Sequence, residues 1–404
     1  MLVLEARDRI GGRILTVEDA GVPIPVELGA EFIHGEAPVT GELLARAGLS
    51  ALDLRTEYGA ARHGMPGRAD YFSAIDRVLR HIDRKGPDES IAAFLARRPG
   101  GRALERERGL TRHFVEGYHA ADVRRISAQS IAPEPGERPS AEVLRAGRVT
   151  RGYGSLVAWL AGDLRASLRL GCAVNAIAWR EGRVEVEARL ASGHPFRCRA
   201  RAAIVTAPVG VLQAPNGARG SIAFDPMPAR IRRAVEGFEM GTVVRLVVWF
   251  HDFPWSDATK RSEFVPLSDG PFQSLWTARP FRWPLGVVWC GGPRAATLSR
   301  DPRAEVLRAM ENQLAHAFRL SSRRVKGSIR RVWWHDWDRD PYTRGAYTYL
   351  KVGAAGSPPA LAKPEERTLF FAGEATEREG GTVEAALTSG RRAARQVLRA
   401  LRRP

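Results

Sequence analysis

A carboxylate followed by a glycine- and arginine-rich loop stands near the start of the chain. The apolar residues 2–4 lead into Glu5, and Ala-Arg-Asp-Arg-Ile-Gly-Gly-Arg follows, ending at Arg13. In doubly wound nucleotide-binding domains the second strand ends in an acid, which accepts hydrogen bonds from the ribose hydroxyls. Paired glycines such as Gly11 and Gly12 let the backbone approach a ligand closely, and arginine pairs well with phosphate oxygens. These residue types at this spacing predict one half of a dinucleotide site.

The other end of the chain carries a second turn between a strand and a helix. Residues 369–372 (Leu-Phe-Phe-Ala) predict a buried strand, and Gly373, Glu374 and a glycine pair follow it. The pattern then predicts a last helix over about 383–402. A helical block and a tryptophan-rich block of strands lie between the two ends. The ends therefore predict one α/β domain, and the inserted blocks predict a second one.

Seven segments extend these two motifs over nearly the whole chain. They are LEARDRIGGR (4–13), ELGAEFIHG (27–35), RGYGSLVAWLA (151–161), AIVTAPVGVL (203–212), GTVVRLVVWF (241–250), DWDRDPYTRGAYTYL (336–350) and LFFAGEATEREGGTVEAALTSGRRAARQVL (369–398). In this order they resemble the flavin-containing amine oxidase family, which includes monoamine and polyamine oxidases, lysine-specific histone demethylases and L-amino-acid oxidases. The resemblance implies an α/β fold, in which an FAD-binding Rossmann-like (doubly wound) domain is interleaved with an α+β substrate domain. We expect the FAD-binding domain over 1–55, 148–215 and 362–404, and the substrate domain over 56–147 and 216–361.

The resemblance also assigns residues to FAD, which we expect to be bound non-covalently. Ala346 stands where monoamine oxidases carry the cysteine that bonds the flavin. Glu5 resembles the ribose ligand, and Val174 resembles the residue whose main chain contacts the adenine. The other positions that resemble cofactor contacts are Arg7, Gly11, Gly12, Arg13, Gly29, Ala30, Trp337, Gly373, Glu374, Gly381, Thr382 and Val383. Since a helix N-terminus carries partial positive charge, the turn at 381–383 would stabilise negative charge on the reduced flavin.

Four side chains resemble substrate contacts. Trp337 resembles an aromatic residue packed against the isoalloxazine, and Tyr347 resembles one wall of an aromatic cage that holds an amine over the flavin. Thr382 stands where monoamine oxidases have the second aromatic residue of the cage. Polyamine oxidases and histone demethylases resemble this chain in having a threonine there. His34 resembles the substrate-contacting acid or histidine of polyamine oxidases. A purely structural role is the alternative for His34 and for Tyr347.

Two features depart from the family. Arg245 stands where the family has a lysine that holds a water against the flavin N5 atom. Because an arginine is bulkier and does not lose its proton, we expect slow reaction with dioxygen, or another electron acceptor. The G-x-G-x-x-G turn that should precede Glu5 by about 20 residues is absent, which indicates that the first β-α unit is missing. We expect a misassigned start codon or a truncated gene, and the in-frame DNA upstream of Met1 distinguishes the two.

Composition narrows the class of protein. The formal charge is +17, but 57 of the 62 basic residues are arginines spread along the chain. This distribution is typical of GC-rich codon usage rather than of a surface for nucleic acid. No apolar run reaches the roughly 18 residues of a membrane helix, and three cysteines without CxxC spacing disfavour disulfides and zinc. We expect a cytoplasmic protein with no nucleic acid, membrane span or metal, and the oligomeric state stays open.

The predicted activity is FAD-dependent oxidation of the C–N bond of an amine, either polyamine-like or an amino acid. A hydride passes from the carbon beside a neutral amine nitrogen to the flavin, and the resulting imine hydrolyses. Arg245, Tyr347 and Trp337 are the expected catalytic residues, and dioxygen or another acceptor takes the electrons. The alternatives are a truncated, inactive flavoprotein remnant and an FAD-dependent desaturase of an apolar polyene or ring. His34, Tyr347 and the hydrophilic segment 336–345 favour the amine.

Overall fold

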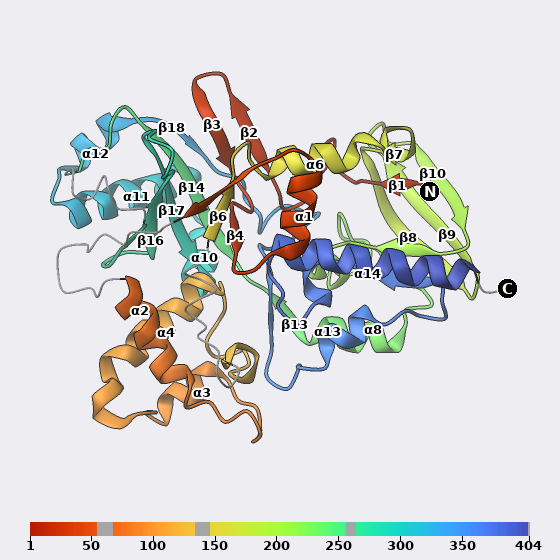
Figure 1. Ribbon diagram of the computed structural model, residues 1–404, viewed down its shortest axis with the longest axis horizontal. Coiled ribbons are helices and arrows are strands. Elements are labelled where there is room, and N and C mark those ends of the chain that lie inside the picture. The colour runs from red at the N-terminus through yellow and green to blue at the C-terminus, as the bar shows by residue number, and fades with distance from the viewer. Residues whose placement is uncertain (55–67, 134–145, 256–263, 403–404) are drawn as a thin grey trace.

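The computed structural model describes residues 1–54, 68–133, 146–255 and 264–402. The chain forms two lobes (Figure 1). One lobe holds both ends of the chain. The other holds a five-stranded antiparallel sheet and the helices of residues 68–118.

The strands near the ends of the chain form two parallel pairs. β1 (Val3–Leu4) pairs with β7 (Leu168–Arg169), and β11 (Ala203–Val205) pairs with β20 (Leu369–Phe371). In the described part of the chain, the two pairs are not hydrogen-bonded to each other. Parallel pairing between distant segments is typical of an α/β domain.

The apolar residues 202–206, which run toward Pro208, predict a fully buried strand, and this prediction is wrong at its centre. The strand forms, but the Ile204 side chain is 41% exposed, whereas Val205 is 6% exposed. Side chains alternate between the two faces of a strand. Ile204 lines a large cavity beside β11, and its face of the strand is therefore not covered by packed side chains.

The period of two over residues 174–198 predicts a meander of strands, and this prediction is confirmed as part of a four-stranded sheet. Its strands in spatial order are β10 (Pro195–Ala200), β9 (Arg183–Leu190), β8 (Cys172–Arg180) and β12 (Ala223–Asp225). Gly182 and Gly193 lie in the two hairpin turns with φ of +71° and +87°, a conformation that glycine adopts without a steric penalty.

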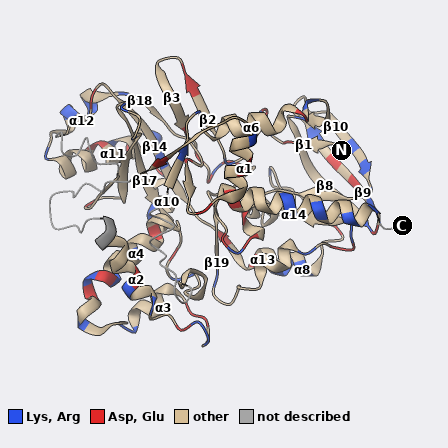
Figure 2. Cartoon of the chain, in the orientation of Figure 1, with Lys and Arg blue, Asp and Glu red and all other residues tan. Residues whose placement is uncertain are grey.

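Helices surround the strands of this lobe and include the predicted last helix. They are α1 (Pro38–Arg46), α6 (Tyr153–Gly162), α7 (Val209–Leu212), α8 (Ala229–Glu236), α13 (Ser357–Ala362) and α14 (Val383–Arg402). Gly48, with φ of +64°, follows α1 as predicted. Figure 2 shows basic residues along α14 and on β9 and β10.

The second lobe is built on the five-stranded sheet. Its strands in spatial order are β15 (Phe264–Pro266), β16 (Ser274–Thr277), β17 (Leu285–Gly291), β14 (Val243–Phe250) and β18 (Ile329–Trp333). The helices that follow β17 are α10 (Gly292–Leu298), α11 (Arg303–Phe318) and α12 (Ser322–Ser328). Because β14 lies between two neighbouring strands, it is buried along almost its whole length, and Arg245 lies within it.

A helical block packs beside this sheet. Its elements are α2 (Arg68–Leu79), α3 (Ile91–Ala96), η1 (Gly101–Leu104), α4 (Glu105–Tyr118) and η2 (Gln129–Ile131). The helical spacing of Ile75, Val78, Leu79 and Ile82 predicts a buried apolar face. This prediction is confirmed, since each of these side chains is at most 8% exposed.

Short sheets connect the two lobes. They comprise β2 (Thr16–Asp19) with β3 (Val22–Glu27), β4 (Phe32–His34) with β6 (Ala146–Val149) and β5 (Ala51–Leu54), and β13 (Phe238–Met240) with β19 (Thr348–Leu350). The remaining 3-10 turns are η3 (Arg165–Ser167) and η4 (Glu374–Thr376). Val26 packs against the five-stranded sheet, while the Glu27 carboxylate accepts the Tyr153 N–H of α6 at 2.7 Å. The segment after β3 is thereby fixed between the lobes.

Candidate active site

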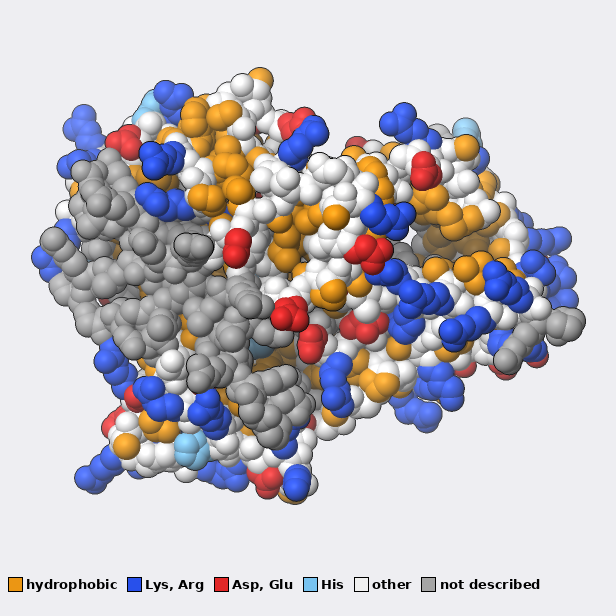
Figure 3. Space-filling model, in the orientation of Figure 1, with side chains coloured by type: hydrophobic (Ala, Val, Ile, Leu, Met, Phe, Trp, Pro, Cys, Tyr) orange, Lys and Arg blue, Asp and Glu red, His pale blue; other side chains and the backbone are white. Residues whose placement is uncertain are grey.

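A cavity of about 3150 Å³ runs from the two ends of the chain toward the five-stranded sheet. Figure 3 shows a recess with hydrophobic side chains next to α14. The structure places every predicted site residue in the lining of this cavity: Glu5, Arg7, Gly11, Gly12, Arg13, Gly29, Ala30, His34, Val174, Arg245, Trp337, Tyr347, Gly373, Glu374, Gly381, Thr382 and Val383.

Glu5 lies at the end of β1 with part of its carboxylate available. Its Oε1 accepts the Arg7 backbone N–H at 2.8 Å, and the side chain is 25% exposed. Its Oε2 accepts no hydrogen bond from any residue that the structure describes. Since a carboxylate offers about four acceptor positions, Glu5 can still bind ribose hydroxyls.

Arg7 links the N-terminal loop to the segment that carries Trp337. Its Nη2 donates to Asp340 Oδ1 at 2.8 Å, and its guanidinium carbon lies 5.3 Å from the centre of the Tyr342 ring. His335 Nε2 lies 2.9 Å from Asp340 Oδ2. Burial alone would raise the pKa of Asp340, but hydrogen bonds from His335, Arg7 and the Tyr342 backbone hold that pKa well below its usual range.

The predicted glycines serve two different purposes. Gly12 and Gly373 have φ of +58° and +138°, and no atom lies within 4 Å of the position that a Cβ would take. Their backbones are therefore accessible to a ligand. A Cβ on Gly29 would instead collide with the Arg13 carbonyl oxygen and lie 3.2 Å from the Trp337 ring. Gly29 thus permits the Arg13 backbone and the Trp337 ring to approach this turn closely.

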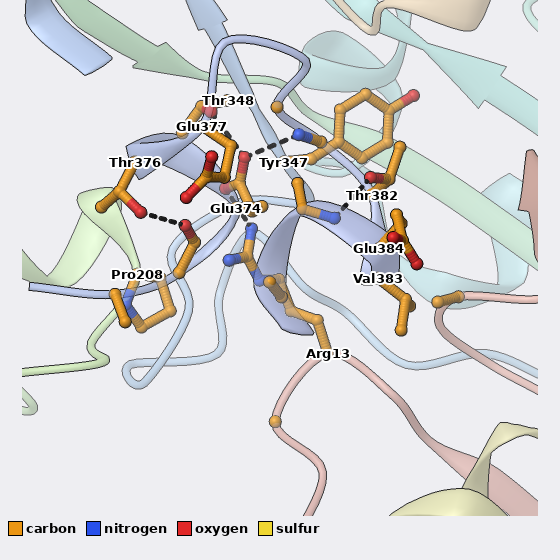
Figure 4. Close-up of a pocket in the computed structure, with 18 of the residues that line it drawn as sticks. Arg13, Pro208, Tyr347, Thr348, Glu374, Thr376, Glu377, Thr382, Val383 and Glu384 are labelled. Atoms are coloured by element: carbon orange, nitrogen blue, oxygen red, sulfur yellow. Dashed lines mark hydrogen bonds and ion pairs between the residues drawn. The ribbon is translucent and has the colours of Figure 1, made fainter. Parts of the chain in front are cut away.

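Glu374 joins the two ends of the chain at the middle of the cavity. Its Oε1 accepts Arg13 Nη1 at 2.8 Å, and its Oε2 accepts Thr348 Oγ1 at 2.7 Å and the Gly381 N–H at 2.9 Å. Figure 4 shows the carboxylate between Arg13 and Thr348. Glu374 is 5% exposed, so these contacts lie in a region shielded from water. The carboxylate fixes the turn that leads into α14.

The first turn of α14 offers backbone donors to the cavity. The Thr382 hydroxyl accepts the Ala385 N–H at 3.0 Å, whereas the N–H groups of Thr382, Val383 and Glu384 donate to no described residue. Figure 4 shows these three residues around the same pocket. Unpaired N–H groups and the helix dipole together favour negative charge at this end of the helix.

Trp337 is buried beside the turn at Gly29. It is 4% exposed, and its Nε1 donates to the Leu28 carbonyl oxygen at 2.9 Å. The His335 ring lies against it, with 4.1 Å between the ring centres. Trp337 is therefore held in one orientation at the cavity wall.

Aromatic and histidine rings form the wall of the cavity between the lobes. Tyr347 donates its hydroxyl to the Tyr118 carbonyl oxygen at 2.6 Å, and it lies against Gly381. The His34 ring meets the Tyr118 ring edge-on, with 6.0 Å between centres. Burial lowers the pKa of His34 to about 4, and its Nδ1 has no hydrogen-bond partner among the described residues. His34 is thus an uncharged side chain whose Nδ1 is buried without a hydrogen-bond partner among the described residues.

The burial of His119 predicts that the free energy of unfolding falls as the pH is lowered. Burial lowers the pKa of His119 from 6.5 to about 4, so the unfolded chain binds a proton between these values while the folded chain does not. We expect its contribution to be complete above pH 6.5 and to fall by about 3 kcal/mol as the pH approaches 4. Urea unfolding of His119→Phe across this range should show a shallower pH dependence. An unchanged pH dependence would contradict the assignment, and the exposed His194 provides a control replacement.

A buried ionic network surrounds Arg245. Arg245 is 5% exposed, donates from Nε to the Glu27 carbonyl oxygen at 3.0 Å, and donates from Nη2 to Glu31 Oε2 at 2.5 Å. Arg148 binds Glu31 Oε1 at 2.8 Å, and Trp276 Nε1 donates to Oε2 at 2.9 Å. Burial would raise the pKa of Glu31, but Arg148 and Arg245 hold it below its ordinary value. Glu31 therefore carries a stable negative charge between two arginines.

Sequence reasoning missed Glu31, Arg148 and Trp276. Glu31 lies in the turn before β4, Arg148 lies in β6 and Trp276 lies in β16. No local sequence pattern connects these three residues. The available signal was Glu31 itself, which stands in the apolar segment 28–33 close to Gly29. A buried acid requires buried partners, so that segment could have indicated a buried cation, although not which residue supplies it.

The arrangement suits an elongated, partly anionic cofactor better than a metal ion. The described residues contain no group of three or more side chains positioned to hold a metal. Glu5, the open glycines and the N-terminus of α14 instead offer acceptors, close backbone approach and unpaired donors along the cavity. These features fit a dinucleotide carrying a flavin. Among the described helices, none combines the length and the apolar character needed to cross a membrane.

Solved structures of amine oxidases share this fold. The structure of putrescine oxidase bound to putrescine has a TM-score of 0.78, with 19% identity over 98% of this chain and 93% of that chain. Cyclohexylamine oxidase from Brevibacterium oxydans has a TM-score of 0.77, with 20% identity over 100% of this chain and 94% of that chain. The predicted fold class, an FAD-binding Rossmann-like domain with a substrate domain, is confirmed.

Sequence comparison gives the family. The model of the flavin containing amine oxidoreductases matches residues 1–398. The chain is 26% identical to Polyamine oxidase 3 of Oryza sativa subsp. japonica over 98% of this chain and 84% of the relative. It is 28% identical to Polyamine oxidase 2 of Arabidopsis thaliana over 98% of this chain and 82% of the relative. These matches confirm the predicted FAD cofactor and oxidoreductase class, and they do not favour a remnant or a desaturase. The chain therefore belongs to the flavin-containing amine oxidoreductase family.

Proposed function

We propose that both ends of the chain hold one non-covalently bound FAD in the cavity, and that the site oxidises the C–N bond of a small amine. The observation that carries this proposal is the contact of Arg13 with Glu374 and of Glu374 with Gly381. These bonds place the N-terminal loop beside the unpaired N–H groups of α14. Glu5 and Val174 would bind the adenosine end, and Ala346 leaves the flavin without a cysteine to bond.

The residues of the chain have separate tasks in this reaction. When bound, the flavin supplies the acceptor for a hydride from the carbon beside the amine nitrogen. Trp337 would pack against the bound flavin, and the N-terminus of α14 would favour negative charge on it. Tyr347 and the uncharged His34 orient a neutral amine, with Thr382 opposite. No side chain is required as a strong base.

The domain bounds, the location of the protein and its electron acceptor are part of the same proposal. Residues 1–55, 148–215 and 362–404 would form the FAD-binding domain, and residues 56–147 and 216–361 would form the substrate domain. A cytoplasmic location is supported by Cys172, Cys198 and Cys290, none of which forms a disulfide. Dioxygen or another acceptor would reoxidise the flavin.

Arg245→Lys should accelerate reoxidation of the reduced flavin by dioxygen. A lysine can lose and regain a proton near the flavin, and proton transfer of this kind contributes roughly 100-fold or more to rate. We expect the rate of reoxidation to increase by only about tenfold. The lysine side chain is shorter than arginine and reaches Glu31 less well, so it is held less firmly for proton transfer. Mixing the reduced protein with oxygenated buffer in a stopped-flow instrument measures this step alone. An unchanged rate would show that Arg245 does not limit reoxidation.

A dye-linked assay tests the proposed function. Acid precipitation of the yellow protein should release FAD into the supernatant, and amines should drive reduction of an artificial electron acceptor with formation of an aldehyde. A polyene in place of the amine should give no reduction. Covalently retained flavin would refute non-covalent binding, and dye reduction by the polyene alone would refute amine oxidation.

A further inference from the structure

Arg245 presents an unused pair of donors to the cavity. Its Nε is occupied by the Glu27 carbonyl oxygen and its Nη2 by Glu31. Its Nη1 donates to no residue that the structure describes, and it is not among the sealed side-chain atoms that lack a partner. The side chain lines the cavity and lies 5.4 Å from the centre of the Trp276 ring. Arg245 is thus a firmly held cation that lines the cavity and has an Nη1 that no described residue accepts.

Glu31 cannot serve as the partner of a second cation. Its Oε1 accepts from Nε and Nη2 of Arg148, and its Oε2 accepts from Arg245 Nη2 and Trp276 Nε1. These four donors fill the roughly four acceptor positions of a carboxylate. An ammonium group that entered this region would have to displace an arginine or the indole.

The charge of this region is positive. Arg148, Arg245 and Glu31 carry a net charge of +1 in a buried network, with side chains at most 9% exposed. The neighbouring Glu27 carboxyl offsets only part of this charge at neutral pH, because burial raises its pKa to about 7. His34, which lies close enough to Glu31 to interact with it, is uncharged at neutral pH because burial lowers its pKa to about 4. A buried cation attracts an anion strongly where water does not screen it.

We propose that Arg245 anchors the carboxylate of the substrate, so that the amine oxidised at this site is an amino acid rather than a diamine. This inference rests on the proposed function, in which the flavin oxidises an amine. Arginine offers planar paired N–H groups, which match the two oxygens of a carboxylate. Trp276 covers the guanidinium and keeps it in place. The amine end then extends toward Tyr347 and the flavin.

Substrates that differ only at their far end test the proposal. Three series of unbranched primary amines of equal length end in a carboxylate, a methyl group or a second ammonium; 4-aminobutyrate, butylamine and 1,4-diaminobutane form one such set. Each is mixed anaerobically with the holoenzyme while the visible absorbance of the flavin is followed. We expect the amino acid of the best length to reduce the flavin at a concentration roughly 10- to 100-fold lower than the matching diamine does. Tighter binding of the diamine would overturn the proposal.

Variants separate anchoring from folding. Arg245→Gln should weaken the binding of the amino acid about 10- to 100-fold more than it weakens the binding of butylamine, and Arg245→Lys should recover part of this difference. Arg197→Gln is the control, because that arginine is 77% exposed on β10. Calorimetry with butyrate, which carries no amine, should give binding heat with the unaltered protein and none with Arg245→Gln. Equal butyrate binding to both proteins would contradict the anchor.

Failure of this inference is distinct from failure of the proposed function. If no amine of any series bleaches the flavin, amine oxidation itself is wrong. If butylamine and the diamines bleach it and the amino acids do not, the function stands and the carboxylate anchor is wrong.

Discussion

Glu374→Ala should yield protein that has lost its flavin and much of its stability. The carboxylate is 5% exposed and bonds Arg13, Thr348 and the Gly381 N–H. Removing one partner of a buried ion pair leaves the other unpaired and costs about 3–5 kcal/mol. The loop of Arg13 and the start of α14 would then no longer be held together. Visible flavin absorbance relative to protein absorbance after purification, together with urea unfolding, measures both effects.

Two further variants sharpen this test. Glu374→Gln preserves the shape of the side chain but not its charge, and it should lose flavin to an intermediate degree. Glu185→Ala removes an exposed carboxylate of β9, where ion pairs contribute little, and it should retain full flavin content. Full flavin content in Glu374→Ala would show that this contact does not organise the site.

Glu31→Gln should produce a loss of stability of similar size by a different route. The glutamine cannot satisfy Arg148 and Arg245 together, so two buried arginines lose their shared counter-charge. We expect the free energy of unfolding to fall by about 3–5 kcal/mol. Equilibrium unfolding in urea gives this value if the slope of the transition is unchanged.

A double-mutant cycle assigns the effect to the pair. Replacing both Glu31 and Arg245 by glutamine removes one positive charge together with the negative one. The double variant should therefore be more stable than the sum of the two single effects predicts, by about 1–3 kcal/mol. Additive effects would show that Glu31 and Arg245 do not stabilise each other.

Sequence patterns predicted the elements whose signals are local. The alternation over 174–198 and the helical face at Ile75–Ile82 are confirmed because each depends on the period of its own backbone. The start of α14 at Val383 was also predicted, because a glycine pair precedes a run of helix-forming residues. The candidate site residues were assigned through the resemblance, and all of them line one cavity.

The parts that were not predicted depend on tertiary structure. Arg148 lies in β6, Arg245 lies in β14 and Glu31 lies in the turn before β4. They are far apart in the sequence, and each alone has the appearance of an ordinary charged residue. The exposure of Ile204 has the same origin, because only the cavity beside β11 decides which face of that strand is covered. Neither feature leaves a periodic signal.

Anaerobic titration of the purified flavoprotein with an amine tests the central claim most directly. The protein is prepared as the printed chain and with the in-frame codons upstream of Met1, and its visible spectrum is recorded during addition of the amine. We predict that flavin absorbance bleaches in proportion to the amine consumed, with one equivalent of aldehyde formed for each flavin reduced. A yellow protein that keeps its full absorbance with every amine and amino acid would contradict amine oxidation. Absence of flavin from both preparations would contradict the cofactor site itself.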